Sequence, residues 1–179
     1  MGQSTYMFEP LNKPRTKLSN DPKCICAWLP DDDHGWICNV SRHPVTINSC
    51  TWPSVEHFYQ AQKFIGHPDL MEQIAHEPNP EKAKGIAHAP ENTPLVRSDW
   101  EIEKDEVMHI GLRAKVQQNP DVLQHLLASG DLHIVEDSPV DYYWGCGENG
   151  TGLNRLGALW EEIRQQLRMS GNKALDLID

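Results

Sequence analysis

One short segment, TWPSVEHFYQAQKF at residues 51–64, places side chains capable of chemistry on one side of a predicted helix. At about 100° per residue, Glu56, Gln60 and Lys63 fall within a narrow arc, and Tyr59 lies beside it. A carboxylate can stabilise a developing cation or deprotonate water, and a nearby lysine keeps it ionised. The arc is therefore a candidate catalytic and substrate-binding face, and a solvated face with helical ion pairs is the alternative.

A second carboxylate, Asp141, opens the segment DYYWGCGENGTGLNRLG. Cleavage of a glycosidic bond often uses two carboxyl groups, one for the water or the developing cation and one for the leaving group. Glu56 and Asp141 are therefore the candidate pair, and their roles are interchangeable at this point. An aspartate before two aromatic residues is equally typical of a turn.

The same segment is rich in glycine and leads into a helix predicted to start near Leu153. Its glycines are Gly145, Gly147, Gly150 and Gly152. Glycine lets the backbone approach a ligand closely, and amides at a helix start suit a phosphate. Trp144, with the tyrosines before it, predicts a stacking wall for a planar ligand. The alternative is a mobile surface turn.

The pattern of apolar residues predicts the elements that position these groups. Two β-prone runs, residues 35–40 and 45–50, predict a small antiparallel hairpin, and residues 132–136 predict a short strand. Helical periodicity and caps predict helices at about residues 54–65, 69–76, 80–88, 98–112, 119–130 and 153–167. The fold class is α+β, a mostly helical, compact single domain over residues 1–179 with a small antiparallel β element.

Local signals add detail to this outline. Ser98 and Glu101 form a capping-box pattern at one helix start. Gln62 falls on the apolar side of the helix that starts near residue 54, so its amide is expected to be buried and bonded to another segment. Residues 1–30 show no clear period and predict extended segments and turns. Residues 171–179 are expected to form a flexible tail.

Composition limits the class of partner. The net charge of −10 argues against an extended cationic groove for nucleic acid, although a local site for one phosphate or base remains open. No apolar run approaches the length that crosses a bilayer, so no membrane partner is expected. Oligomeric state is not predicted.

The five cysteines are odd in number, and no export signal precedes them, which favours reduced thiols and a cytoplasmic location. Cys24 and Cys26, with histidines and cysteines up to residue 50, raise the alternative of zinc. Their spacing lacks the paired C-x-x-C of a structural site, so no metal is expected.

Taken together, the sequence resembles the YbiA-like proteins, also called the NADAR family, for NAD and ADP-ribose association. The resemblance covers about residues 18–167 and is carried by SVEHFYQAQK, by DWEIEKDEVM and by DYYWGCGENGTGLNRLG. It implies a compact helical α+β domain that hydrolyses N-glycosidic bonds with no metal or organic cofactor. Known activities in the family act on early riboflavin-pathway ribosylamino-pyrimidine phosphates or remove ADP-ribose from guanine.

The resemblance also implies roles for residues that match the family's motifs. These residues are Ser19, Asn20, Glu56, Lys63, Asp141, Trp144 and Asn154. Glu56, Asp141 and Lys63 are expected to be catalytic. The expected substrate-binding residues are Ser19, Asn20, Tyr59, Gln60, Trp144, Gly145, Gly147, Gly152 and Asn154.

Two departures from the family pattern concern substrate recognition. Asp21 follows Asn20 where the family usually has a phenylalanine, which removes a stacking group. Ile86 follows Gly85 where the family often has an arginine, which removes a candidate phosphate ligand.

The expected function is hydrolysis of the ribosyl C1′–N bond of a phosphorylated riboside, with an early riboflavin-pathway ribosylamino-pyrimidine phosphate as the expected substrate. Removal of ADP-ribose from guanine, as a nucleobase or in DNA, is one alternative. A non-catalytic module that binds ADP-ribose or a nucleotide is a second. A zinc-stabilised interaction domain is a third.

Overall fold

The computed structural model describes residues 18 and 21–171 of the 179-residue chain. Ser19, Asn20 and nearly all of the expected tail lie outside the described residues. The helices are α1 (Val55–Ala61), α2 (Pro68–His76), α3 (Pro80–Ala87), α4 (Trp100–Gln118), α5 (Pro120–Ala128) and α6 (Arg155–Met169). The 3-10 turns are η2 (Gly35–Ile37), η3 (Gln62–Phe64) and η4 (Thr93–Leu95). The strands are β1 (Cys24–Ala27), β2 (Val45–Ile47), β3 (Cys50–Trp52) and β4 (His133–Glu136).

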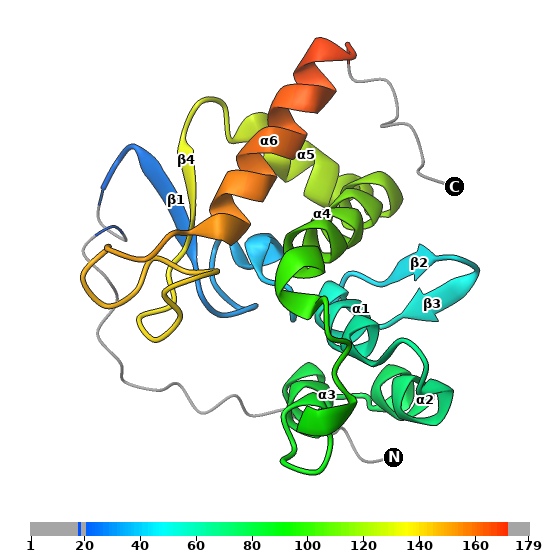
Figure 1. The fold of residues 1–179 in the computed structure, drawn as a ribbon. Helices are drawn as coiled ribbons and strands as arrows, with labels where there is room; N and C mark the ends of the chain where they lie inside the picture. Colours follow the sequence, from blue (N-terminus) through cyan, green and yellow to red (C-terminus); the bar gives the residue numbers. More distant parts are fainter. Residues whose placement is uncertain (1–17, 19–20, 172–179) are drawn as a thin grey trace, which may run out of the picture.

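Helix α4 runs through the centre of the molecule and contacts α1, α5, α6 and β2 (Figure 1). Helices α2 and α3 pack against α1 on one side, and α6 covers β4 on the other. The apolar face predicted for the last helix is buried at Leu156, Leu159, Trp160, Ile163 and Leu167, whereas Leu153 precedes the helix and is exposed. These faces meet in one hydrophobic core, so the mostly helical α+β class is confirmed.

The antiparallel hairpin exists, but its strands are not the predicted ones. Residues 35–37 form a 3-10 turn, and β2 pairs with β3, with Val45 opposite Trp52. Asn48 and Ser49 make the two-residue turn with positive φ angles of 52° and 63°. Asparagine tolerates this left-handed conformation well, so the segment VTINSC contains the turn rather than continuing as one strand.

A second sheet was not predicted. β1 pairs in parallel with β4, with Cys24 opposite His133 and Ala27 opposite Glu136 (Figure 1). The strand at residues 132–136 is therefore confirmed, but its partner falls in a segment that the sequence predicted only as extended segments and turns. Parallel strands need a long crossover, so their pairing leaves no local sequence signal.

The predicted capping box is wrong. Helix α4 begins after Asp99, not after Ser98, and neither side chain caps the helix. Asp99 instead pairs with Arg97. By contrast, Asn119 and Pro120 begin α5 as predicted, and Gly130 follows it with a φ angle of 57°.

We expect Gly157→Ala to destabilise the fold. Helix α6 lies so close to β4 that a Cβ on Gly157 would stand 1.9 Å from the carbonyl oxygen of Ile134. The resulting overpacking should lower the free energy of unfolding by about 2 kcal/mol, measured by urea denaturation. Gly85→Ala is the matched control, because a Cβ there has no neighbour within 4 Å and alanine favours the helix. Equal stability of the two variants would contradict the close packing of α6 on β4.

Candidate active site

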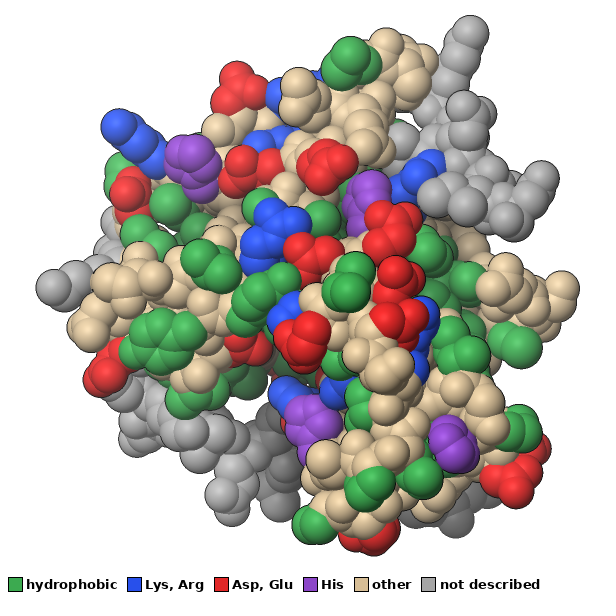
Figure 2. Space-filling view, viewed as in Figure 1, with side chains coloured by type: hydrophobic (Ala, Val, Ile, Leu, Met, Phe, Trp, Pro, Cys, Tyr) green, Lys and Arg blue, Asp and Glu red, His purple; other side chains and the backbone are tan. Residues whose placement is uncertain are grey.

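A cavity of about 840 Å³ opens between α1, α3 and the loop after β4. Figure 2 shows a hollow in this part of the surface, with basic and histidine side chains near its rim. The polar residues that line it are Asn39, Glu56, Tyr59, Gln60, Lys63, Glu81, Lys84, His88, Glu136, Ser138, Asp141, Tyr142 and Tyr143. Most of the residues predicted from the first helix and from the aromatic segment thus come together in one place.

The predicted arc of α1 faces this cavity and not bulk solvent. Glu56, Gln60 and Lys63 are 6%, 2% and 8% exposed, so the solvated-face interpretation is wrong. Helix α1 is buried on every side, because its other residues, Val55 and Phe58 among them, enter the hydrophobic core. Burying three such polar groups is costly unless they serve one another or a ligand.

Gln62 does not have the predicted role. It lies in the 3-10 turn η3 and is only partly buried. The helix tightens after Ala61, so the α-helical spacing that placed Gln62 among apolar residues no longer applies. The buried amide of this segment is Gln60.

Glu56 is held at both its backbone and its side chain. Its backbone N–H donates to the carbonyl oxygen of Asn39 at 3.1 Å. Its Oε1 accepts a hydrogen bond from Nε2 of Gln60 at 2.7 Å. Burial raises the pKa of Glu56, while the Gln60 hydrogen bond and the charges of Lys84 and Lys63 act in the opposite direction. The carboxyl group is therefore held in a buried position at the cavity wall, near the lysines.

Lys63 lies at the end of the arc, among aromatic rings. Its Nζ is 3.0 Å from Nε2 of His88 and 5.6 Å from the ring centroids of Tyr59 and Trp100. Burial lowers the pKa of Lys63 to about 8, although the charge of Glu56 acts to raise it. Burial and the charges of two lysines also lower the pKa of His88, so the histidine ring accepts the hydrogen bond.

An aromatic wall forms one side of the cavity. Tyr59 packs against Trp100 at 4.9 Å and edge-on against Trp144 at 5.6 Å between ring centroids. Trp144 meets Tyr143 at 5.0 Å in a second edge contact. The residues of this wall that line the cavity thus come from α1 and from the loop after β4, and Trp100 supports Tyr59 from outside the lining.

Asp141 lines the cavity, but its carboxylate is engaged by the loop. Its Oδ1 accepts the backbone N–H groups of Tyr143 at 2.8 Å and of Trp144 at 2.7 Å. This is the turn geometry that the sequence left open as an alternative. The bonds orient Trp144 toward Tyr59.

The start of α6 does not present free amides. The backbone N–H groups of residues 153–156 donate to carbonyl oxygens of residues 142–145 at 2.9–3.2 Å. The structure therefore gives no support to the phosphate site expected there.

The loop glycines serve the loop itself. A Cβ on Gly147 would meet the ring of Tyr142 at 2.6 Å, and one on Gly152 would meet the carbonyl oxygen of Gly145 at 2.4 Å. A Cβ on Gly145 would lie 2.9 Å from Ser138. None of the three glycines lines the cavity.

Asn154 also lies outside the cavity lining, and it ties β4 to α6. Its Oδ1 accepts from the backbone N–H of Glu136 at 3.0 Å, and its Nδ2 donates to the carbonyl oxygen of Ile134 at 2.8 Å. Asn154 has a left-handed backbone, with a φ angle of 48°. Its amide fixes the strand end that borders the cavity.

Six polar residues of the cavity wall were not predicted: Asn39, Glu81, Lys84, His88, Glu136 and Ser138. Lys84 and His88 come from α3 and the residue after it, where the spacing of four predicts one helix face. Glu136 ends a predicted strand, a place where binding residues are often found. Asn39 had no local signal. Its Oδ1 and the Oε1 of Gln60 are buried and have no hydrogen-bond partner among the described residues.

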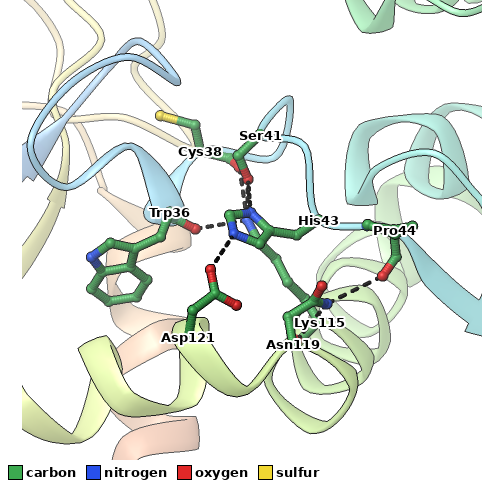
Figure 3. Close-up of polar contacts among 8 residues, drawn as sticks. All are labelled: Trp36, Cys38, Ser41, His43, Pro44, Lys115, Asn119 and Asp121. Carbon is green, nitrogen blue, oxygen red and sulfur yellow. Dashed lines mark hydrogen bonds and ion pairs between the residues drawn. The ribbon is translucent and has the colours of Figure 1, made fainter.

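A buried lysine supports the segment that carries Asn39. Lys115 of α4 donates to the carbonyl oxygens of Trp36 and Cys38 at 2.7 and 2.9 Å and to Oγ of Ser41 at 2.6 Å. Figure 3 shows these contacts beside His43. The loop between η2 and β2 is thus anchored to the central helix.

The same network links a serine, a histidine and an aspartate through consecutive hydrogen bonds. Ser41 lies 2.9 Å from Nδ1 of His43, and Nε2 of His43 lies 2.9 Å from Asp121 (Figure 3). Ser41 is only 3% exposed and accepts a hydrogen bond from Lys115. This arrangement therefore holds the loop and does not present a nucleophile.

The residues considered for zinc do not gather. Cys24 lies in β1, Cys38 is buried in the core and His43 pairs with Asp121. Within the part of the chain that the structure describes, no three His, Cys, Asp or Glu side chains form a metal-binding group. Among the described helices, none is long and apolar enough to cross a membrane.

Comparison with known proteins identifies the class to which this fold and cavity belong. The family model of the NADAR domain matches residues 19–168, and the chain belongs to this family. It is 36% identical to the N-glycosidase Npun_R5314 of Nostoc punctiforme, over 79% of this chain and 89% of that protein. It is 38% identical to the N-glycosidase YbiA of Escherichia coli, over 80% of this chain and 88% of that protein.

The structural comparison agrees. The NMR structure of E. coli YbiA superposes with a TM-score of 0.75 and 33% identity, and the match covers 87% of this chain and 91% of that one. The riboflavin biosynthesis protein PYRR of Zea mays is 36% identical over 76% of this chain and 24% of its own length. The predicted family membership is confirmed.

Proposed function

We propose that this protein is a hydrolase that cleaves the ribosyl C1′–N bond of a phosphorylated riboside. The observation that carries the proposal is the buried carboxyl group of Glu56, held by Gln60 beside Lys63 and facing an aromatic wall. The names of the N-glycosidase relatives support the same class of reaction.

Cleavage of this bond develops positive charge on C1′ and the ring oxygen of the ribose. Glu56 stabilises that charge as a carboxylate, or deprotonates the attacking water. Gln60 and Lys63 favour the ionised form of Glu56 through a hydrogen bond and a nearby charge. Asp141 is a positioning residue, because its hydrogen bonds to the loop backbone orient Trp144.

The unpaired acceptors on the cavity wall suit a sugar. The buried Oε1 of Gln60 and Oδ1 of Asn39 need donors, and ribose hydroxyl groups are donors. Trp144 and Tyr59 offer faces and edges on which a planar base can pack. A hydroxylated ring bonded to a flat base satisfies both parts of the cavity.

We place the phosphate against Lys84 and His88, with Lys63 behind them. Lys84 directly precedes Gly85, so it lies next to the position where the family's arginine is absent. Lys84 and His88 lie on the α3 side of the cavity, where the lysine supplies positive charge and the histidine ring a hydrogen-bonding group. By contrast, the backbone amides of residues 153–156 donate to loop carbonyl oxygens. A basic group at a cavity mouth favours an anionic ligand.

An early riboflavin-pathway ribosylamino-pyrimidine phosphate is the proposed substrate. This choice is supported by the resemblance of the site motifs and by the name of the Zea mays relative. Removal of ADP-ribose from guanine is the alternative outcome of the test. We place the reaction in the cytoplasm, because the odd number of cysteines favours reduced thiols.

The test supplies both substrates separately to the purified protein and follows the released base by mass spectrometry. We expect release from the ribosylamino-pyrimidine phosphate with repeated turnover and little release from ADP-ribosylated guanine DNA. Release only from the DNA would overturn the proposed substrate but keep the reaction class. Binding of ADP-ribose with no release from either substrate would overturn the hydrolase proposal.

A further inference from the structure

Glu136 stands at the carboxyl edge of the parallel strand pair. It is the last residue of β4, opposite Ala27 of β1, and its side chain lines the cavity. Ligands of parallel sheets commonly bind beyond the carboxyl ends of the strands. Its backbone is fixed, because its N–H donates to Asn154 at 3.0 Å and its carbonyl oxygen accepts from Cys146 at 2.9 Å. The carboxyl group is thus presented from a rigid position.

The surroundings of this carboxyl group favour its neutral form. Among the described residues, no donor hydrogen-bonds to its side chain. Burial and the charges of Asp141, Asp137 and Glu56 raise the pKa of Glu136 well above its usual range. Lys84 of α3 is the cation that opposes them. A buried carboxyl group with several carboxylates nearby keeps its proton near neutral pH.

Glu56 in the same cavity is placed differently. It accepts a hydrogen bond from Gln60, and the charges of Lys84 and Lys63 favour its ionised form. Burial and Glu81 raise the pKa of Glu56 too, but Gln60 and two lysines oppose that rise. At Glu136 three carboxylates add to the effect of burial, and Lys84 opposes them. Two carboxyl groups whose environments separate their protonation states suit one basic and one acidic role.

We propose that Glu136 is the general acid of this site and donates its proton to the nitrogen of the leaving base. This inference rests on the proposed hydrolysis. As the C1′–N bond breaks, its electron pair moves to nitrogen, and the proton of Glu136 completes the neutral base. Water adds its oxygen to C1′ and gives one proton to Glu56. Glu56 then releases its proton to solvent and Glu136 takes one back from solvent, so both groups are restored and the net reaction consumes one water molecule.

The kinetic test compares Glu136→Gln, Glu136→Asp and Glu148→Gln on the ribosylamino-pyrimidine phosphate. Glu136→Gln keeps the size of the side chain and should lower kcat/KM by about 10²–10⁴-fold, the range for general acid catalysis. Glu136→Asp keeps a proton donor and should recover part of the loss. Glu148 is exposed on the same loop outside the cavity lining, so Glu148→Gln should match the wild type. Activity of Glu136→Gln within threefold of the wild type would overturn the assignment.

A titration separates this inference from the proposed function. Glutamate labelled with ¹³C at the carboxyl carbon gives a resonance for Glu136, identified by its loss in Glu136→Gln. We expect it to titrate above the ordinary glutamic acid range in wild-type protein, and closer to that range in Glu56→Gln. A wild-type protein that hydrolyses neither substrate would refute the proposed function without changing this titration. Titration of Glu136 in the ordinary range would overturn its role as a proton donor whatever the substrate.

Discussion

Glu56→Gln is expected to lower turnover of the ribosylamino-pyrimidine phosphate by about 10³-fold, with little change in KM. The loss of that size follows because a positioned carboxylate acts on charge that exists only in the transition state. Glutamine has the same shape and still offers an oxygen to Nε2 of Gln60. The free energy of unfolding should be unchanged or slightly higher, since burial already disfavours the ionised carboxyl group. Initial rates and urea denaturation measure the two effects.

The matched control is Glu72→Gln, on α2 outside the cavity lining. It removes the same charge and should leave kcat and KM within twofold of the wild type. Turnover by Glu56→Gln close to that of this control would remove Glu56 from the mechanism. An equal loss in both variants would point to net charge as the cause.

Lys115→Met is expected to cause the largest loss of stability. Lys115 is fully buried, and its side-chain nitrogen hydrogen-bonds with the carbonyl oxygens of Trp36 and Cys38 and the hydroxyl of Ser41. Methionine fills the space but leaves three buried acceptors without that donor. We expect the free energy of unfolding at pH 9 to fall by about 3 kcal/mol. Urea denaturation beside the exposed-site control Lys82→Met measures the change.

The effect of Lys115 should also depend on pH. Burial lowers its pKa to about 7 from 10.5, so between these values the unfolded chain binds more protons than the folded one. Wild-type stability relative to Lys115→Met should therefore rise as the pH increases from 7 to 10.5. If the stability difference between wild type and Lys115→Met falls over this pH range, Lys115 does not have a lowered pKa in the folded protein.

The loss should reach the active site as well. The segment held by Lys115 includes Asn39, whose carbonyl oxygen accepts the backbone N–H of Glu56. Loosening that segment moves an acceptor of the cavity wall and the start of α1 together. We expect Lys115→Met to bind substrate more weakly even at temperatures where it remains folded.

Helical periodicity predicted most of the fold, because each helix has a local apolar face. The faces of α5 and α6 are examples, and Asn119 and Pro120 marked the start of α5 correctly. The strand β1 escaped prediction because its partner β4 lies far along the chain. The hairpin was misplaced because the left-handed turn at Asn48 resembles the middle of a β-prone run.

The site was predictable where its residues share one element. Glu56, Gln60 and Lys63 follow from spacing along α1 and the turn after it, but their burial depends on α3 and on the loop after β4. Lys84 and Glu136 had weak local signals, a helix face and a strand end, but which cavity they line depends on tertiary packing. The glycine segment had the composition of a phosphate-binding loop. Its carbonyl oxygens, however, accept hydrogen bonds from the backbone amides of residues 153–156, where a phosphate was expected.

The most direct test of the central claim is a time course of sugar phosphate and free base released from the ribosylamino-pyrimidine phosphate, followed by mass spectrometry with substrate in large excess over enzyme. We expect both products to appear in equal amounts, to exceed the enzyme concentration many times over, and to be nearly abolished in Glu56→Gln. Release no greater than the uncatalysed rate, or equal release by wild type and Glu56→Gln, would contradict this expectation.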